Sequence, residues 1–113
     1  MMEHIQVFTT TENRDDAKRI AKDLVEKNLV ACAQVIGPIE STYRWQGKIE
    51  EAQEWLCILK SRYDRYDRLE ERIKRIHPYE EPEILATSVV KGSHGYLQWL
   101  DRQVASDPEN DGG

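Results

Sequence analysis

Residues 29–61, L-V-A-C-A-Q-V-I-G-P-I-E-S-T-Y-R-W-Q-G-K-I-E-E-A-Q-E-W-L-C-I-L-K-S, decide the fold because they predict one long β-hairpin. Residues 29–36 are a nearly continuous apolar run, which favours a strand covered on both faces. Gly37-Pro38 interrupts the run, and since proline cannot donate to a ladder we expect a bulge or kink there. Gln46-Gly47 is a turn signal, after which residues 49–61 return as the second arm. Arms of this length would extend beyond the rest of a 113-residue domain and stay uncovered unless another chain packed against them.

The hairpin also carries both cysteines of the chain, Cys32 and Cys57. If Trp45 and Lys48 flank the turn, counting back along the two arms places Cys57 opposite Ile36. Cys32 then lies roughly 13 Å further along the ladder at the rise of a strand. A disulfide needs Cα atoms within about 7 Å of each other. We therefore expect two free thiols.

The segment before the hairpin predicts a strand followed by an amphipathic helix. Residues 4–9 (H-I-Q-V-F-T) form the strand. Asn13 is a suitable N-cap, and apolar side chains then recur every three or four residues until Asn28, which can adopt the left-handed conformation that ends a helix.

The segment after the hairpin predicts a helix, a strand and a last short helix. Asp64 caps the first of these helices, which ends at His77 because a proline follows. Residues 83–90 form the last strand, and Ser93 caps the C-terminal helix.

The resulting order predicts an α+β chain with a ferredoxin-like βαββαβ fold, in which a four-stranded antiparallel sheet carries two helices on one face. The long hairpin and the short C-terminal helix are additions to that plan. We expect the third helix or neighbouring subunits to cover the other face. Residues 1–105 form one domain, and residues 106–113 (S-D-P-E-N-D-G-G) form a disordered acidic tail.

The overall charge argues against two classes of partner. The chain has 16 basic and 21 acidic residues, a net charge of −5, so it is a poor ligand for nucleic acid or anionic membrane. Residues 54–60 lack the basic-glycine-aromatic signature of an RNA-recognition domain. No apolar run approaches the ~20 residues that span a bilayer. We expect a cytoplasmic protein.

The segment I-H-P-Y-E-E-P-E-I, residues 76–84, holds the densest group of chemically active side chains. Its two prolines stiffen it. His77 is a candidate metal ligand or general base, and the alternative is a histidine that caps its helix and binds nearby carbonyls. Glu80, Glu81 and Glu83 are candidate ligands or solvated carboxylates. Glu83 is the best placed to be held, because it follows a proline and opens a strand.

The tryptophans are expected to be core or interface anchors rather than ligand-stacking groups. Trp45 is the exception, because a large aromatic side chain beside an exposed turn needs a covering partner. Residues 9–13 (T-T-T-E-N) offer no phosphate-binding loop with a positioned arginine, which an acylphosphatase-like hydrolase would need. We therefore expect a protein that is not an enzyme.

Five motifs in one order make the chain similar to the CutA1 divalent-cation tolerance family: L-V-A-C-A (29–33), Y-R-W-Q-G-K-I-E (43–50), I-L-K (58–60), H-P-Y-E-E-P-E-I (77–84) and Y-L-Q-W-L (96–100). This resemblance implies a ferredoxin-like fold assembled as a tight homotrimer, with long hairpins that wrap neighbouring subunits. It also implies a role in tolerance to copper and other divalent ions.

The resemblance further implies candidate site residues. The bacterial type uses a cysteine at the end of the first strand and two histidines before Pro-Tyr as metal ligands. Thr9 and Ile76 occupy the cysteine and first histidine positions here, so only His77 is retained. The implied function is weak binding of Cu²⁺ or another divalent cation, with His77 and Glu83 as metal contacts.

The alternative implied function is a PII-like trimeric small-molecule sensor or assembly scaffold. Trimers of that signalling type bind ligands in clefts between subunits. Trp45, Lys60 and Tyr79 would line the cleft in this chain.

Overall fold

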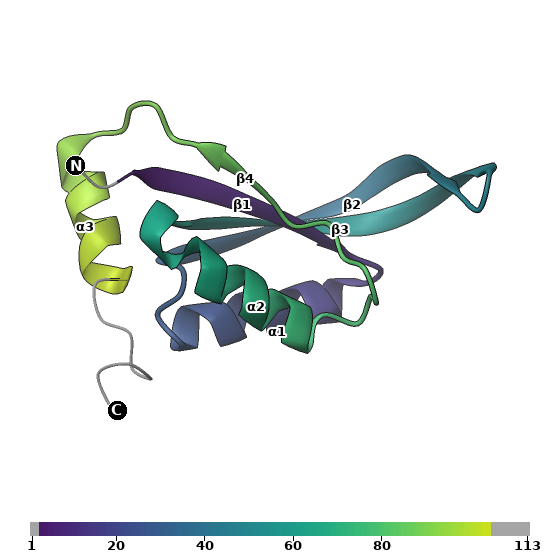
Figure 1. Cartoon of the computed structure of the whole chain (residues 1–113), viewed down its shortest axis with the longest axis horizontal. Coiled ribbons are helices and arrows are strands. Elements are labelled where there is room, and N and C mark those ends of the chain that lie inside the picture. The colour runs from purple at the N-terminus through teal and green to yellow at the C-terminus, as the bar shows by residue number, and fades with distance from the viewer. Residues whose placement is uncertain (1–2, 105–113) are drawn as a thin grey trace.

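The structure, a computed structural model that describes residues 3–104, confirms the α+β ferredoxin-like fold. The elements are β1 (His4–Thr11), α1 (Arg14–Glu26), β2 (Cys32–Trp45), β3 (Lys48–Arg62), a 3₁₀ turn (Tyr63–Arg65), α2 (Tyr66–Ile76), β4 (Leu85–Ser88) and α3 (His94–Val104). The strands form one antiparallel sheet in the order β2-β3-β1-β4, and α1 and α2 lie on the same face of it (Figure 1). The predicted tail, residues 106–113, lies outside the described residues.

The long hairpin extends beyond the rest of the sheet. β1 pairs with β3 only as far as Thr11, which lies opposite Trp55. Residues 48–54 of β3 therefore pair with residues 39–45 of β2 alone, and we call this two-stranded part the free hairpin. It projects past α1 and α2, at the right of Figure 1.

The turn at the tip of the free hairpin is the predicted two-residue turn. Trp45 pairs with Lys48, and the two residues between them have positive φ, 50° at Gln46 and 79° at Gly47. This backbone is that of a type I′ turn, whose twist matches that of the flanking strands. Glycine adopts it without the steric cost that a β-carbon brings.

The predicted bulge lies at Gly37-Pro38, and beyond it the observed register differs from the expected one. Ile39 pairs with Glu54, but Ile36 pairs with Leu56, so the ladder is shifted between these two pairs. Cys57 therefore faces Val35 rather than Ile36, because the bulge adds a residue to β2. Both cysteines are free thiols, as predicted.

Helix ends follow the sequence at α1 and depart from it at α2. The Asn13 side chain accepts a hydrogen bond from the Asp16 backbone N–H at 2.8 Å, and Asn28 has φ 58° just past α1. The prediction that Asp64 caps α2 is wrong. Asp64 lies in the 3₁₀ turn and accepts hydrogen bonds from Arg62 at 2.9 and 3.0 Å, and α2 begins at Tyr66 with no side-chain cap.

The edge strand β4 is shorter than predicted. The sequence suggested residues 83–90, whereas β4 spans Leu85–Ser88 and pairs only with Ile5 to Phe8 of β1. Glu83 therefore belongs to the segment between α2 and β4 rather than to a strand.

The core lies between the sheet and the two helices. Alternate residues of β1 and β3 point to that face, and they meet the apolar stripes of α1 and α2. The buried side chains of this cluster are Ile5, Val7, Ala17, Ile20, Leu24, Leu29, Val30, Cys57, Leu59, Leu69 and Ile73.

The opposite sheet face, which we call the open face, is covered only at one end by residues 3–104. There α3 packs Leu100 and Val104 against Ala31, and Asp101 binds His4 at 2.9 Å. Figure 1 shows α3 at the end of the sheet away from the free hairpin. Within this chain β2 is not covered on both faces as expected, since Ile36 is 49% exposed.

Thr9 provides a test of the core. Among residues 3–104, its hydroxyl is the buried side-chain oxygen that lacks a hydrogen-bond partner. We expect Thr9→Val to raise the free energy of unfolding by about 1 kcal/mol, because it removes an unsatisfied group and keeps the shape of the side chain. Urea unfolding at fixed chain concentration measures this. Thr42→Val, at an exposed position, should change it by less than about 0.5 kcal/mol. A destabilised Thr9→Val protein would contradict the prediction.

Gly37 provides a second test. A β-carbon at this position would collide with the ring of Trp55, whereas one at Gly95 in α3 would meet nothing within 4 Å. We expect Gly37→Ala to lower the free energy of unfolding by about 1–3 kcal/mol through overpacking. The control Gly95→Ala should leave it unchanged or raise it by up to about 1 kcal/mol, because alanine favours helix. Equal effects at the two positions would argue against the close packing at Trp55.

Candidate functional site

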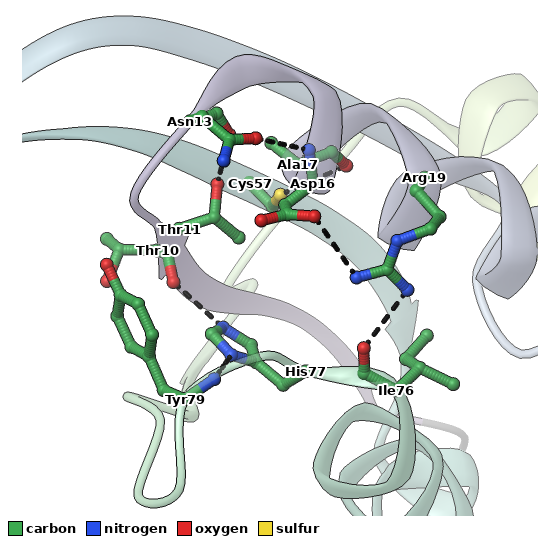
Figure 2. A network of polar contacts seen from close by, with 10 residues as sticks. All are labelled: Thr10, Thr11, Asn13, Asp16, Ala17, Arg19, Cys57, Ile76, His77 and Tyr79. Carbon is green, nitrogen blue, oxygen red and sulfur yellow. Dashed lines mark hydrogen bonds and ion pairs between the residues drawn. The ribbon is translucent and has the colours of Figure 1, made fainter.

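The segment of residues 77–84, which we call the connector, joins α2 to β4 and is held by hydrogen bonds to β1 and β3. α2 ends at Ile76, because His77 has ψ 138° and Pro78 follows. Arg19 of α1 donates to the Ile76 carbonyl at 3.0 Å, so the end of α2 is tied to its neighbouring helix. Figure 2 shows this contact beside the His77 ring.

His77 joins the connector to β1. The residue is 8% exposed, and Nε2 of its ring lies 2.8 Å from the Thr10 carbonyl oxygen. Nδ1 accepts a hydrogen bond from the Tyr79 backbone N–H at 3.0 Å (Figure 2). A carbonyl only accepts and an N–H only donates, so the neutral ring with its proton on Nε2 satisfies both contacts. His77 ends α2, as the sequence alternative expected, but its ring binds a single carbonyl, which belongs to Thr10 of β1 rather than to the end of α2.

The protonation of His77 is linked to these contacts. Burial lowers its pKa from the usual 6.5, and the hydrogen bond to Thr10 and the Asp16 carboxylate oppose that shift in part. A protonated ring could not accept the Tyr79 N–H. The local structure therefore requires the neutral form.

Tyr79 joins the connector to the base of the free hairpin. Its hydroxyl donates to Oε2 of Glu54 at 2.8 Å, and its ring lies 4.8 Å from that of His77, centroid to centroid. Burial and the Glu54 carboxylate raise the pKa of Tyr79, so the hydroxyl keeps its proton and acts as a donor.

A hollow of about 950 Å³ lies between the free hairpin and the connector. Alternation along β2 puts the side chains of Ser41, Tyr43 and Trp45 on the side of the hairpin that carries Glu54. The hollow is lined by Ser41, Thr42, Tyr43, Trp45, Glu54, Tyr79, Glu80, Glu81, Pro82 and Glu83. Its walls thus combine three aromatic rings with four carboxylates.

The structure brings some of the predicted site residues together and separates others. Trp45, Tyr79 and Glu83 all line the hollow. His77 contacts Tyr79 but is not one of the lining residues. Lys60 lies further along β3, opposite Gln6 and Cys32, and is not one of them either.

Two lining residues, Tyr43 and Glu54, were not singled out as site residues by the sequence. Glu54 meets Tyr79 only through the fold, since the two are 25 positions apart. The position of Tyr43 on the same side as Trp45 follows from strand alternation, which was the one available signal.

The described residues do not form a preassembled metal site. Among residues 3–104 no three or more His, Cys, Asp or Glu side chains are grouped so that they could hold a metal ion. Thr9 is fully buried opposite Cys57. Burial raises the pKa of the Cys57 thiol to about 11, so this cysteine stays protonated and is a poor metal ligand.

Curated relatives span bacteria, plants and animals. The chain is 42% identical over 94 residues to the divalent-cation tolerance protein CutA of Thermus thermophilus, covering 83% of this chain and 91% of that protein. It is 43% identical over 97 residues to protein CutA of Homo sapiens, covering 86% of this chain. The chain spans only 54% of the human protein and 53% of protein CutA, chloroplastic, of Arabidopsis thaliana.

Solved structures of similar proteins share the fold. CutA1 from Ehrlichia chaffeensis superimposes with a TM-score of 0.88 at 32% identity, covering 94% of this chain and 99% of that one. The Thermus thermophilus protein does so with a TM-score of 0.84 at 40% identity, covering 86% and 94%. The Archaeoglobus fulgidus structure is described as periplasmic. None of the helices within residues 3–104 has the length and apolar character to cross a membrane.

The family model for the CutA1 divalent ion tolerance protein matches residues 5–103, which include β2, β3 and β4, and all but one end residue of β1 and of α3. The match covers the hairpin, the connector and the hollow between them. The chain therefore belongs to the CutA1 divalent ion tolerance protein family.

Proposed function

We propose that this protein acts as a homotrimer in tolerance to divalent cations such as Cu²⁺, without being an enzyme. Membership of the CutA1 family supports the link to divalent cations, since the relatives from Thermus thermophilus and Archaeoglobus fulgidus are named divalent-cation tolerance proteins. The observation that best supports a homotrimer is the open face of the sheet with the free hairpin beside it.

The open face presents apolar side chains in rows across the strands. Ile58 lies opposite Gln34 on one side and Phe8 on the other, and Phe8 lies opposite Leu85. Ile36 is 49% exposed and Leu85 is 60% exposed. Contiguous apolar surface of this kind favours a protein partner, and a second and third copy of the same chain would provide one.

The free hairpin supports the same conclusion. A two-stranded hairpin is only marginally stable alone in water. Within residues 3–104, both of its outer edges carry backbone groups without a neighbouring strand. Trp45 and Ile49 near its tip are 60% and 61% exposed. Packing against a neighbouring subunit would cover these groups.

The metal contacts, His77 and Glu83, differ in how available they are. Glu83 lines the hollow and is exposed. His77 could offer a lone pair only from Nδ1, which accepts the Tyr79 N–H. We propose that any metal contact of His77 requires the connector to release that hydrogen bond, which is consistent with weak binding.

The alternative function, a small-molecule sensor or scaffold, is favoured by a different observation. The hollow of about 950 Å³ is large enough for a small organic ligand, and Trp45 and Tyr79 lie in its walls. This alternative predicts a ligand other than a metal ion.

The assembly is tested by placing a charge on the open face. We expect the wild-type protein to have three times the 13.2 kDa mass of one chain, and Ile58→Glu to shift it to monomer, because burying an unpaired carboxylate is costly. Light scattering during gel filtration measures this. The matched control Val25→Glu, at a partly exposed position on α1, should leave the mass unchanged. A wild-type monomer would contradict the proposal.

The same variants test the function in cells. In a bacterial strain without a gene of this family, wild type and Val25→Glu should restore growth in Cu²⁺, and Ile58→Glu should not. Failure of the wild-type protein to restore growth, at confirmed expression, would count against the tolerance function.

The role of His77 is tested by the pH dependence of stability. Because burial lowers its pKa below 6.5, the unfolded chain takes up a proton that the folded chain does not as the pH falls below 6.5. The free energy of unfolding should therefore decrease as the pH is lowered through that range. We expect a smaller fall in His77→Gln, measured by urea unfolding between about pH 7.5 and pH 5. The exposed control His94→Gln should behave as the wild type.

Calorimetric titration with Cu²⁺ separates this structural role from a metal contact. Heat that is lost in both His77→Gln and Glu83→Gln supports the two residues as metal contacts. Heat that is unchanged in both contradicts them.

A further inference from the structure

We propose that the acidic tail of this chain, residues 106–113, docks on a groove that arginine side chains of α2 line. This groove, which we call the arginine groove, has a volume of about 310 Å³ and is lined by Leu29, Arg68, Glu71, Arg72 and Arg75. The proposal does not depend on the proposed cation tolerance. It concerns a part of the chain that follows residues 5–103, which the family model matches.

The arginine groove lies on the helix side of the sheet, between α2 and the end of α1. Asp23 of α1 accepts two hydrogen bonds from the guanidinium group of Arg72, at 2.9 and 2.7 Å, so the two helices are tied together along the groove. None of the lining residues belongs to the open face or to the free hairpin. The proposed homotrimer uses those two surfaces, so docking in this groove does not compete with the assembly.

The charge of the arginine groove is positive, although the chain as a whole has a net charge of −5. Its lining residues include three guanidinium groups and one carboxylate, that of Glu71, which lies 3.6 Å from a nitrogen of Arg75. A guanidinium group has five N–H donors, which is more than one carboxylate can accept. A segment that fits this groove therefore brings carboxylates and no cations.

The tail has the composition that the groove requires. Its sequence, S-D-P-E-N-D-G-G, has acidic residues at positions 107, 109 and 111 and contains no Lys or Arg. In an extended segment alternate side chains point to the same side, about 7 Å apart. Arg68 and Arg72 are four residues apart on one side of α2, about 6 Å along the helix axis. The two spacings are therefore similar.

The end of α3 brings the start of the tail to one end of the arginine groove. Val104 packs against Ala31, and its carbonyl accepts a hydrogen bond from Nε of Arg65 at 2.7 Å. Arg65 lies three residues before Arg68, and Ala31 lies two residues after Leu29. Both walls of the groove thus lead to Val104. Figure 1 shows the last turn of α3 beside the start of α2.

The tail is long enough to follow the groove. Arg75 lies ten residues beyond Arg65, a distance of about 15 Å at the rise of a helix. An extended chain covers about 3.3 Å per residue, so Asp111, seven residues after Val104, can lie up to about 23 Å from it. The carboxylates of the tail can therefore reach each arginine of the groove without moving α3.

The test measures how well the groove protects the tail from proteolysis. A glutamate-specific protease cuts after Glu109, and mass spectrometry of the full-length protein gives the rate of this cut. The reference is the rate for a free peptide of residues 103–113. We expect the tail of the wild-type protein to be cut about three to ten times more slowly than the peptide, since exposed ion pairs are individually weak. This protection should disappear in about 1 M salt, where the Debye length is only about 3 Å.

Variants of the groove locate the contact. Arg68→Gln combined with Arg75→Gln should bring the cutting rate to within about 1.5-fold of that of the free peptide. The control is Lys18→Gln combined with Lys74→Gln, which removes the same charge from exposed positions of α1 and α2 that do not line the groove. The control should keep the protection of the wild type.

A variant of the tail tests the contact from the other side. Asp107→Asn combined with Asp111→Asn keeps the cleavage site at Glu109 and leaves residues 3–104 unchanged. We expect it to lose at least half of the protection, relative to a free peptide with the same substitutions. This variant decides the proposal if the arginine variant fails to fold.

Three outcomes would overturn the proposal. The first is a wild-type tail that is cut as fast as the free peptide at low salt, including the case in which inorganic phosphate binds the wild type and not the arginine variant, because the groove would then serve a free anion. The second is protection that neither the arginine variant nor the tail variant removes. The third is protection that grows with protein concentration, which would assign the groove to the tail of another assembly.

Discussion

The pairing of β3 with its two neighbours is the constraint on which the rest of this structure depends. One side of β3 pairs with β1 and the other with β2, and the alternate side chains between them supply Cys57 and Leu59 to the core. Because β3 is longer than β1, the same strand also extends the sheet into the free hairpin. The core, the open face and one wall of the hollow therefore all depend on a single register.

Much of this register could be predicted from the sequence. Gln46-Gly47 set the turn, and Asn13 and Asn28 marked the ends of α1. The position of the bulge was also visible in Gly37-Pro38. Its effect on the pairing of Cys57 was not, because the sequence left open whether Gly37-Pro38 makes a bulge, which adds a residue to β2, or only a kink. The start of α2 was missed for a similar reason, since Arg62 engages the side chain that would have capped it.

The candidate site was predictable only in part. The sequence pointed to the connector and to Trp45, but local pattern says nothing about contacts between distant segments. The bond between Tyr79 and Glu54, and the engagement of both nitrogens of His77 by backbone groups, exist only in the folded chain. His77 thus shows how a residue that resembles a ligand in sequence can have its lone pair occupied by the backbone in the structure.

The two-residue period of the free hairpin limits how its length can change. Inserting one residue in either arm alone would turn every side chain beyond it to the opposite face. Adding one residue to each arm would keep the pairing but reverse the face on which the tip, including Trp45, presents its side chains. Only insertions or deletions of two residues in both arms preserve pairing and facing together. Chains with this architecture can therefore lengthen or shorten the hairpin in steps of about 7 Å.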